Sequence, residues 1–405
     1  MMRTWVAALG TLLVAFGAIV AGCSGGRRAV AAAVSAAAAQ PPSVRCGEAA
    51  VVGPSLRLVR ARLLSLPGTP DGVATTPDGH TSFVAIQSGV PRIAVIDNSP
   101  SGERLLRTVV VPAYASGMRV TPNGRYVLGA AGRGAVVLDV AAARSGVGHS
   151  LLGSLAAPAG VAGAGPGAAE IAVSPDSRYA FVTLEGAGAV AVFGLDAAIS
   201  DGFGAKGFLG SIPVGVGALG ITVSPDGDWL YEVSESGGGR SADDRGALNV
   251  IELKRAVSDP PRSVIATAAA ACAPVRVAVS AAGTTVWVTA KDGNALLGFS
   301  AVALRSDPAH ALVSVTRVGE QPLGLAVAGG GRLVLVADSN FSNSRRARSG
   351  VSVVETASSD KPTLLGSIPA GKLADAISVA PTGDSALVTN SDSKQLEALA
   401  LHRLP

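Results

Sequence analysis

The chain has 405 residues, of which 48% are hydrophobic and only 15% charged, and it contains 51 glycines and 24 prolines. This composition excludes an intrinsically disordered protein, which is poor in apolar residues, and a mainly helical protein, which holds few glycines. The formal net charge of +4 is small, and aromatic residues, at 4%, do not alternate with basic ones. We therefore expect no nucleic-acid partner.

The N-terminal segment is typical of an export signal. Arg3 provides a positive charge, and residues 4–22 are almost all apolar. Residues 19–23 (IVAGC) resemble the lipobox of bacterial lipoproteins, in which the chain is cut before a cysteine that then carries acyl chains. The resemblance predicts a lipoprotein signal peptide over residues 1–22 and lipidation of Cys23. An ordinary cleaved signal peptide, which would give a secreted protein, or a retained membrane helix is the alternative. Residues 23–48 are rich in Ala, Gly and Pro and predict a flexible linker.

An internal repeat of about 50 residues predicts the fold of the remaining chain, residues 49–405. Each copy holds an apolar run that leads into a tight turn of the Pro-Asp-Gly kind, then a second apolar run, a polar loop, and two further apolar runs. Short aliphatic runs separated by Gly, Pro and Asp are typical of β-strands. Four strands in each of seven copies predict an all-β fold, a single seven-bladed β-propeller. The repeat starts are 72–79 (GVATTPDG), 117–124 (GMRVTPNG), 170–177 (EIAVSPDS), 220–227 (GITVSPDG), 276–283 (RVAVSAAG), 324–331 (GLAVAGGG) and 376–383 (AISVAPTG).

The two ends of the repeat array complement each other. An isolated apolar run follows Ser55, ahead of the first copy, and the seventh copy ends at Pro405 without a fourth run of its own. We expect the N-terminal strand to complete the seventh blade, because this closes the ring and removes its exposed edges.

The repeat resembles the YVTN-type propeller family, whose units read approximately VSPDGRYLYVTN. The matching segments are 173–183 (VSPDSRYAFVT), 223–234 (VSPDGDWLYEVS) and 379–390 (VAPTGDSALVTN), and the resemblance extends over nearly all of residues 55–405. It implies the blade structure strongly. It implies little about function, because lactonase-like enzymes, surface proteins and binding proteins all belong to the family.

Cys46 and Cys272 are the two cysteines outside the signal segment. A pair of thiols in an oxidising compartment favours one disulfide. The predicted fold, however, places Cys272 between the fourth and fifth blades and Cys46 ahead of the strand that completes the seventh. Bonding would require the segment 46–54 to cover a long distance, since the two Cα atoms must lie within about 7 Å. The sequence leaves the bond open.

Charged residues interrupt the apolar pattern where the innermost strands begin, at the face that we call the top. Arg119 replaces a small residue, Glu170 and Arg276 replace glycine, and Asp71 and Asp375 lie just ahead of that position. They are candidates for ligand binding at the mouth of the central channel, or else solvated rim residues and inter-blade ion pairs. Arg119 would need an acidic partner or a ligand to offset its burial. Two long loops, over 236–246 and 340–350, are either specificity loops of the top face or tolerated insertions.

Motifs of known chemistry are absent or misplaced. The Gly-x-Ser-x-Gly match at 22–26 lies in the export signal, and the Gly-x-Gly-x-x-Gly matches at 202–207 and 215–220 lie around strands rather than ahead of a helix. The four histidines occupy different repeat positions, so we expect neither a metal nor a cofactor.

Together these features predict an exported, membrane-anchored, monomeric propeller that binds an unknown protein or small molecule at its top face. The alternative is a lactonase-like hydrolase acting on an extracytoplasmic lactone, with Glu170 or Asp375 as base and Arg119 or Arg276 stabilising the oxyanion.

Overall fold

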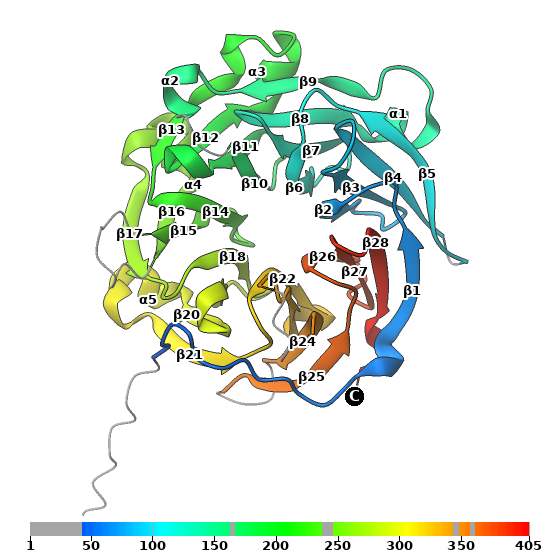
Figure 1. Ribbon diagram of the computed structural model, residues 1–405. Coiled ribbons are helices and arrows are strands. Elements are labelled where there is room, and N and C mark those ends of the chain that lie inside the picture. Colours follow the sequence, from blue (N-terminus) through cyan, green and yellow to red (C-terminus); the bar gives the residue numbers. More distant parts are fainter. Residues whose placement is uncertain are drawn as a thin grey trace, which may run out of the picture. The chain divides into compact units, whose positions relative to one another are not determined.

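The computed structural model describes residues 43–99, 101–162, 167–236, 246–342, 348–356 and 361–404. The expected signal peptide, Cys23 and most of the expected linker lie outside these residues. Within them, seven antiparallel sheets of four strands each follow one another around a ring, which confirms the seven-bladed β-propeller (Figure 1).

The first four blades take their strands in chain order, from the innermost to the outermost. Blade 1 consists of β2 (Pro70–Thr75), β3 (Thr81–Ile86), β4 (Arg92–Ser99) and β5 (Gly102–Val110). Blade 2 consists of β6 (Ala115–Val120), β7 (Tyr126–Ala131), β8 (Gly134–Asp139) and β9 (Leu151–Ala156). Blade 3 consists of β10 (Ala168–Val173), β11 (Tyr179–Leu184), β12 (Ala189–Gly194) and β13 (Phe208–Pro213). Blade 4 consists of β14 (Val216–Val223), β15 (Trp229–Ser236), β16 (Ala247–Glu252) and β17 (Val264–Ala269).

The last three blades follow the same rule except for the final strand. Blade 5 consists of β18 (Pro274–Val279), β19 (Thr285–Ala290), β20 (Ala295–Ser300) and β21 (Leu312–Arg317). Blade 6 consists of β22 (Pro322–Ala328), β23 (Leu333–Asp338), β24 (Gly350–Glu355) and β25 (Thr363–Pro369). Blade 7 consists of β26 (Ala374–Val379), β27 (Ser385–Asn390), β28 (Gln395–Ala400) and, from the other end of the chain, β1 (Arg60–Ser65).

Short helices join strands. Four of them lie between the third and fourth strands of blades 2 to 5 and one follows blade 2: α1 (Val140–Ser145), α3 (Leu195–Ser200), α4 (Leu253–Ser258), α5 (Ala301–Ser306) and α2 (Ala159–Ala162). Single 3-10 turns are η1 (Arg57–Val59), η2 (Glu185–Ala187), η3 (Ala205–Gly207), η4 (Pro260–Arg262), η5 (Lys291–Gly293), η6 (Pro308–His310), η7 (Gly329–Gly331) and η8 (Leu401–Arg403). None of the helices in the described residues is long and apolar enough to span a bilayer.

The repeated turn between the first two strands is fixed by its own side chains. In blade 1 the Thr76 hydroxyl donates to Asp78 Oδ1 and accepts the N–H of Thr81 at 3.1 Å, and the N–H of Gly79 reaches the Thr76 carbonyl at 2.8 Å. Gly79 has a φ of +76°, a conformation that glycine adopts without strain. The Ser/Thr, Asp and Gly of the repeat are therefore the residues that close this turn.

The hydrophobic core is divided among the joints of the ring. The buried apolar residues of the described chain form seven clusters, and each cluster unites two neighbouring blades. Fully buried aromatic rings such as Phe83, Phe181 and Tyr231 lie in these joints. Because each blade buries its faces only against its neighbours, the ring must close for the first and last blades to be covered.

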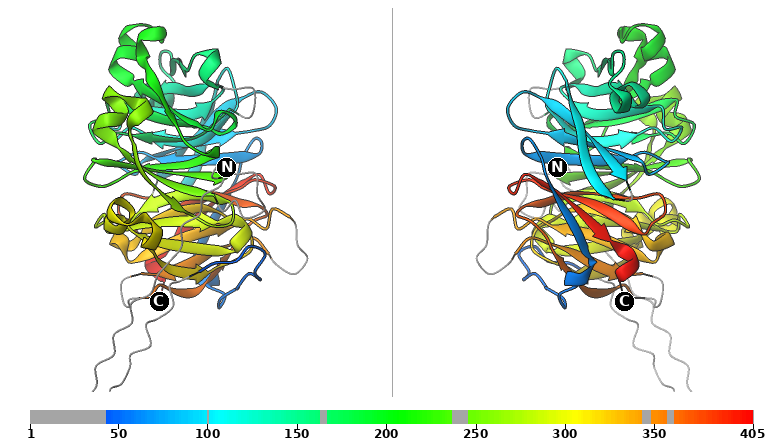
Figure 2. Two further views of the ribbon diagram at one scale, coloured as in Figure 1. Left: turned by 90° about the vertical axis from the view of Figure 1, so that its left-hand side faces the viewer. Right: turned by 90° about the vertical axis from the view of Figure 1, so that its right-hand side faces the viewer.

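The N-terminal strand closes the ring as expected. Strand β1 pairs antiparallel with β28, with Leu63 opposite Glu397 and Ser65 opposite Gln395. The side views in Figure 2 show β1 (blue) beside the C-terminal strands (red). Chain segments more than 300 residues apart thus share one sheet.

Residues 43–59, which we call the strap, run along blades 5 and 6 before β1 begins (Figure 1). The N–H groups of Gly47 and Val51 donate to the carbonyls of Asp292 and Val318, at 2.7 and 2.8 Å. Further along, Ser55 forms an isolated parallel bridge with Ser367 of β25.

The strap brings the two cysteines together. Cys46 and Cys272 form a disulfide with a Cα–Cα distance of 5.3 Å. Val44, 6% exposed, packs into the core between blades 4 and 5 beside the bond. The segment after Cys46 does cover the long distance that we expected a disulfide to require, because the strap follows an extended path across two blades before β1 begins.

Candidate functional site

The residue that opens each innermost strand determines how neighbouring blades meet at the channel mouth. Blades 1, 2, 4 and 6 have glycine there, because a Cβ would collide with the next blade: at Gly324 it would lie 2.0 Å from the Asp375 carbonyl oxygen, and at Gly220 2.7 Å from that of Val275. Blades 3, 5 and 7 carry Glu170, Arg276 and Ala376 at the same position. In each of these three cases the preceding blade has glycine at this position, and the missing side chain leaves room for the residue of the next blade.

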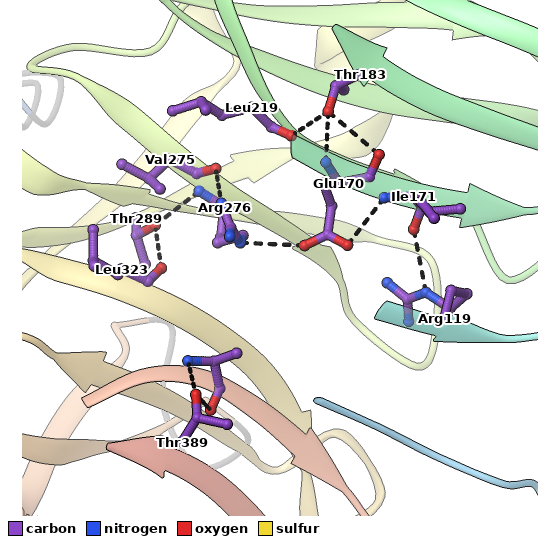
Figure 3. A network of polar contacts seen from close by, with 11 residues as sticks. Arg119, Glu170, Ile171, Thr183, Leu219, Val275, Arg276, Thr289, Leu323 and Thr389 are labelled. Carbon is purple, nitrogen blue, oxygen red and sulfur yellow. Dashed lines mark hydrogen bonds and ion pairs between the residues drawn. The ribbon is translucent and has the colours of Figure 1, made fainter. Parts of the chain in front are cut away.

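A threonine on the second strand accompanies each of these three residues (Figure 3). A register irregularity at the start of the inner strand takes one N–H out of the ladder, and the threonine hydroxyl accepts it, as in Glu170 N–H to Thr183 Oγ1 at 2.9 Å. The hydroxyls of blades 3 and 5 also donate to the next blade's inner strand, to Leu219 and Leu323. The threonines are Thr183, Thr289 and Thr389, whereas the glycine blades hold Ala85, Ala130, Val233 and Ala337.

Glu170 and Arg276 form an ion pair at the channel mouth, between blades 3 and 5 (Figure 3). Arg276 Nε lies 3.3 Å from Glu170 Oε2, and the two side chains are only 19% and 13% exposed. The other carboxylate oxygen of Glu170 accepts the N–H of Ile171 at 3.0 Å. Both oxygens of Glu170 are thus engaged, and the two charges cancel.

Asp71 and Asp375 form a second polar group, on the inner strands of the adjacent blades 1 and 7. The pKa of Asp375 is raised to about 7, chiefly by burial and also by the charge of Asp71, while Arg276 and the Ser391 hydroxyl act against the rise. Burial also raises the pKa of Asp71, against a hydrogen bond of 2.7 Å that Gln87 Nε2 donates to its carboxylate. Because two close carboxylates resist double ionisation, the pair carries fewer than two negative charges near pH 7.

Arg119 differs from the expectation that an arginine on an inner strand is buried. Its side chain is exposed, because strand β6 presents it to the open channel. Its Nε donates to the Ile171 carbonyl at 3.3 Å, and none of the acidic side chains in the described residues forms an ion pair with it. The positive charge of Arg119 is therefore available to a ligand.

The central channel encloses about 410 Å³ and is lined by inner strands of the blades. The charged residues of its lining are Arg119, Glu170 and Arg276. Since Glu170 and Arg276 neutralise each other, the channel carries one net positive charge, which belongs to Arg119. A cavity of this size fits a small molecule.

Three charged residues of the rim were missed in the sequence analysis although they share one repeat position. Glu185, Glu235 and Lys291 each lie six residues after the first residue of the second strand of their blade. Lys291 Nζ lies 2.6 Å from Glu235 Oε1. Burial and the charge of Glu235 raise the pKa of Glu185, and Lys291 and Arg276 lower it. These groups extend the charge network of Glu170 and Arg276 over the tops of blades 3 to 5.

Glu232 is a buried acid that the sequence reading also missed. It lies fully buried on β15, where the other blades have valine or glycine, and it accepts hydrogen bonds from Ser234 and from Asn249 Nδ2 at 2.7 Å. Burial, opposed by these two partners, raises its pKa to about 8. The departure from the valine of the repeat was the signal that could have revealed it.

The remaining expectations concern the loops and metals. Residues 237–245 and 343–347 of the two long loops lie outside the described residues. In the part of the chain that the structure describes, no group of three or more His, Cys, Asp or Glu side chains is arranged to hold a metal ion.

Comparison with known proteins adds the fold alone. No family model matches the chain, and no curated protein matches it. It is similar to a chain of the hydrazine synthase of Kuenenia stuttgartiensis, with a TM-score of 0.62 and 15% identity over 83% of this chain and 96% of that one. It is also similar to a chain of a mitotic checkpoint complex, with a TM-score of 0.63 and 14% identity over 89% and 95% of the two chains. At such identities the likeness establishes the propeller and no activity.

Proposed function

We propose that the chain is an exported, lipid-anchored propeller of the YVTN type, which serves as a binding or scaffolding module of the bacterial cell envelope and takes an anionic ligand in its central channel. The observation that carries the proposal is the unpaired, exposed guanidinium of Arg119 inside a cavity of about 410 Å³. A guanidinium offers several N–H donors in a plane, which suits a carboxylate or a phosphate.

The other candidate residues support this role. The ion pair between Arg276 and Glu170 keeps the Glu170 carboxylate from repelling an anion. Protonation of the Asp71–Asp375 pair removes a further negative charge from the mouth, and burial places the pKa of Asp375 at about 7. Anion binding should therefore be tighter at pH 6 than at pH 8.

A thermal-shift screen tests the ligand class. The full-length chain is heated with citrate, inorganic phosphate or gluconate, each at matched ionic strength, because a ligand that binds the folded state raises the unfolding temperature. We expect at least one anion to stabilise the wild type and not Arg119→Gln. Arg125→Gln, an exposed arginine outside the channel, is the control. Equal stabilisation of all three proteins would refute the assignment of Arg119.

Export and anchoring rest on residues 19–23 and on the Cys46–Cys272 disulfide, a bond typical of oxidising compartments. Labelled palmitate should enter the wild type and not Cys23→Ala. Equal labelling of the two proteins would refute the proposal that Cys23 carries a lipid anchor.

A lactonase-like hydrolase is the second candidate, and Asp375 favours it. A general base works best when its pKa lies near the working pH, and the pKa of Asp375 is about 7. Glu170 is less suited, because Arg276 and Ile171 occupy its oxygens. If the wild type hydrolyses a lactone and Asp375→Asn does not, the hydrolase is supported. If the wild type hydrolyses no lactone, the binding module is the better assignment.

A further inference from the structure

A second and larger cavity lies between the strap and the top loops of blades 6 and 7. We call it the strap groove. It encloses about 880 Å³ and is lined on one side by Val52, Gly53, Ser55 and Arg57 of the strap and Arg60 of β1. The other side is formed by residues 369–373, with Phe341, Arg348 and Asp392 from the loops. It shares no lining residue with the central channel.

The strap groove is strongly basic. Its lining contains four cations, Arg57, Arg60, Arg348 and Lys372, and one carboxylate, Asp392. The charge of Arg60 is neutralised by Glu397, because the Nε atom of Arg60 lies 2.9 Å from the buried Glu397 carboxylate. No other ion pair within the described residues involves the remaining three cations. Three positive charges are thus free to meet a negatively charged partner.

Apolar side chains stand beside these charges. Phe341 is 67% exposed and Val52 is 65% exposed, although both line the groove. An exposed aromatic ring next to arginines is typical of protein-binding surfaces, because it gains contact area at a small cost in conformational entropy.

The walls are held in place before any partner arrives. On the wall opposite the strap, Lys372 N–H donates to Ser393 Oγ at 2.8 Å and Leu373 N–H to Ser349 Oγ at 3.0 Å. The Glu397 carboxylate that holds Arg60 also accepts the N–H of Gly371, at 3.3 Å. A preformed groove loses little freedom on binding.

The edge of blade 6 already binds an extended chain, namely the strap itself. Leu56 N–H donates to the Ser367 carbonyl at 2.9 Å, and Ser367 N–H donates to the Pro54 carbonyl at 2.8 Å. The strap thus pairs with the edge of blade 6 by main-chain hydrogen bonds, which fixes the position of this wall of the groove.

We propose that the strap groove is a docking site for an extended acidic segment of a partner protein, with carboxylates on Arg57, Arg348 and Lys372 and an apolar side chain on Phe341. A recessed groove suits a single peptide chain better than a flat membrane surface. The site is independent of the channel and stands whether or not the channel takes an anion.

Fluorescence anisotropy with a labelled peptide of alternating Glu, Leu and Ser tests the proposal on the full-length chain. The wild type should bind this peptide in the micromolar range, more weakly as salt increases, and should not bind the same peptide with Lys in place of Glu. R57A/R348A/K372A should lose affinity at least tenfold, and Phe341→Ala several-fold.

Controls separate the groove from general electrostatics and from the channel. R144A/K254A/R262A removes three exposed cations elsewhere, and Arg119→Gln removes the channel charge; both should bind the peptide within about twofold of wild type. Equal loss in the two triple variants would overturn the proposal. So would wild-type binding to phosphatidylglycerol vesicles without binding to the peptide.

Discussion

Asp375 offers a quantitative test of the electrostatics at the channel mouth. Its carboxyl keeps a proton in the folded state up to a pKa of about 7, whereas the ordinary value is 3.8. Between these two pH values the folded protein binds more protons than the unfolded chain, so the free energy of unfolding must fall as the pH rises. The stabilising contribution is complete below pH 4 and is lost by about pH 7.

Asp375→Asn removes this dependence. A difference of about 3 pKa units corresponds to at most about 4 kcal/mol, at 1.36 kcal/mol per unit. Asp375 is half-buried, so solvent screening reduces the part that appears as stability, and we expect about 1–3 kcal/mol.

Urea unfolding at a series of pH values from 4 to 9 measures the effect. The variant should be more stable than the wild type at pH 8 and equal to it or less stable at pH 4. Asp196→Asn, an exposed aspartate on α3, is the matched control and should follow the wild-type curve. A constant difference between Asp375→Asn and wild type at all pH values would refute the reasoning.

Three further predictions concern stability. Thr289→Val leaves the Arg276 N–H and the Leu323 carbonyl without their partner, and urea unfolding should show a loss of about 1–3 kcal/mol, against less than 0.5 for the exposed Thr284→Val. Replacement of both Cys46 and Cys272 removes a disulfide that closes a loop of 226 residues, and the loop entropy lost from the unfolded chain corresponds to about 5 kcal/mol of stability. The midpoint of thermal unfolding should therefore fall, and an unchanged midpoint would contradict the role of the strap. Glu232→Gln should flatten the fall in stability up to about pH 8, because the wild-type acid holds its proton to a pKa of about 8; an identical slope would count against its burial as the cause.

Much of the fold could be predicted because every blade repeats the same strand pattern and blades 1 to 4 repeat the same turn. The Thr76–Asp78–Gly79 turn is local, so residues close in sequence specify it completely. Closure by β1 followed from counting strands, since one was missing at the C-terminus and one was surplus at the N-terminus.

The strap could not be predicted, because residues 43–59 lack the period-2 alternation of a strand and their path depends on contacts with blades distant in sequence. The environment of Arg119 was predicted wrongly for a related reason. Whether a side chain on an inner strand is buried depends on the width of the channel, which a strand pattern does not contain. The aligned repeats contain two related alternations. Glu170 and Arg276 replace the glycine of other blades, and Thr183 and Thr289 replace their alanine or valine. Both can be interpreted only when the structure shows how neighbouring blades contact each other.

The affinity of the channel for an anion tests the central claim most directly. Calorimetric titration with citrate, or with whichever anion stabilises the protein most, is carried out on the wild type, Arg119→Gln and Arg125→Gln at pH 6 and pH 8. We predict binding by the wild type that is tighter at pH 6, a loss of at least tenfold in Arg119→Gln, and no change in Arg125→Gln. Equal affinities in the three proteins, or no anion bound by the wild type at either pH, would contradict the proposal.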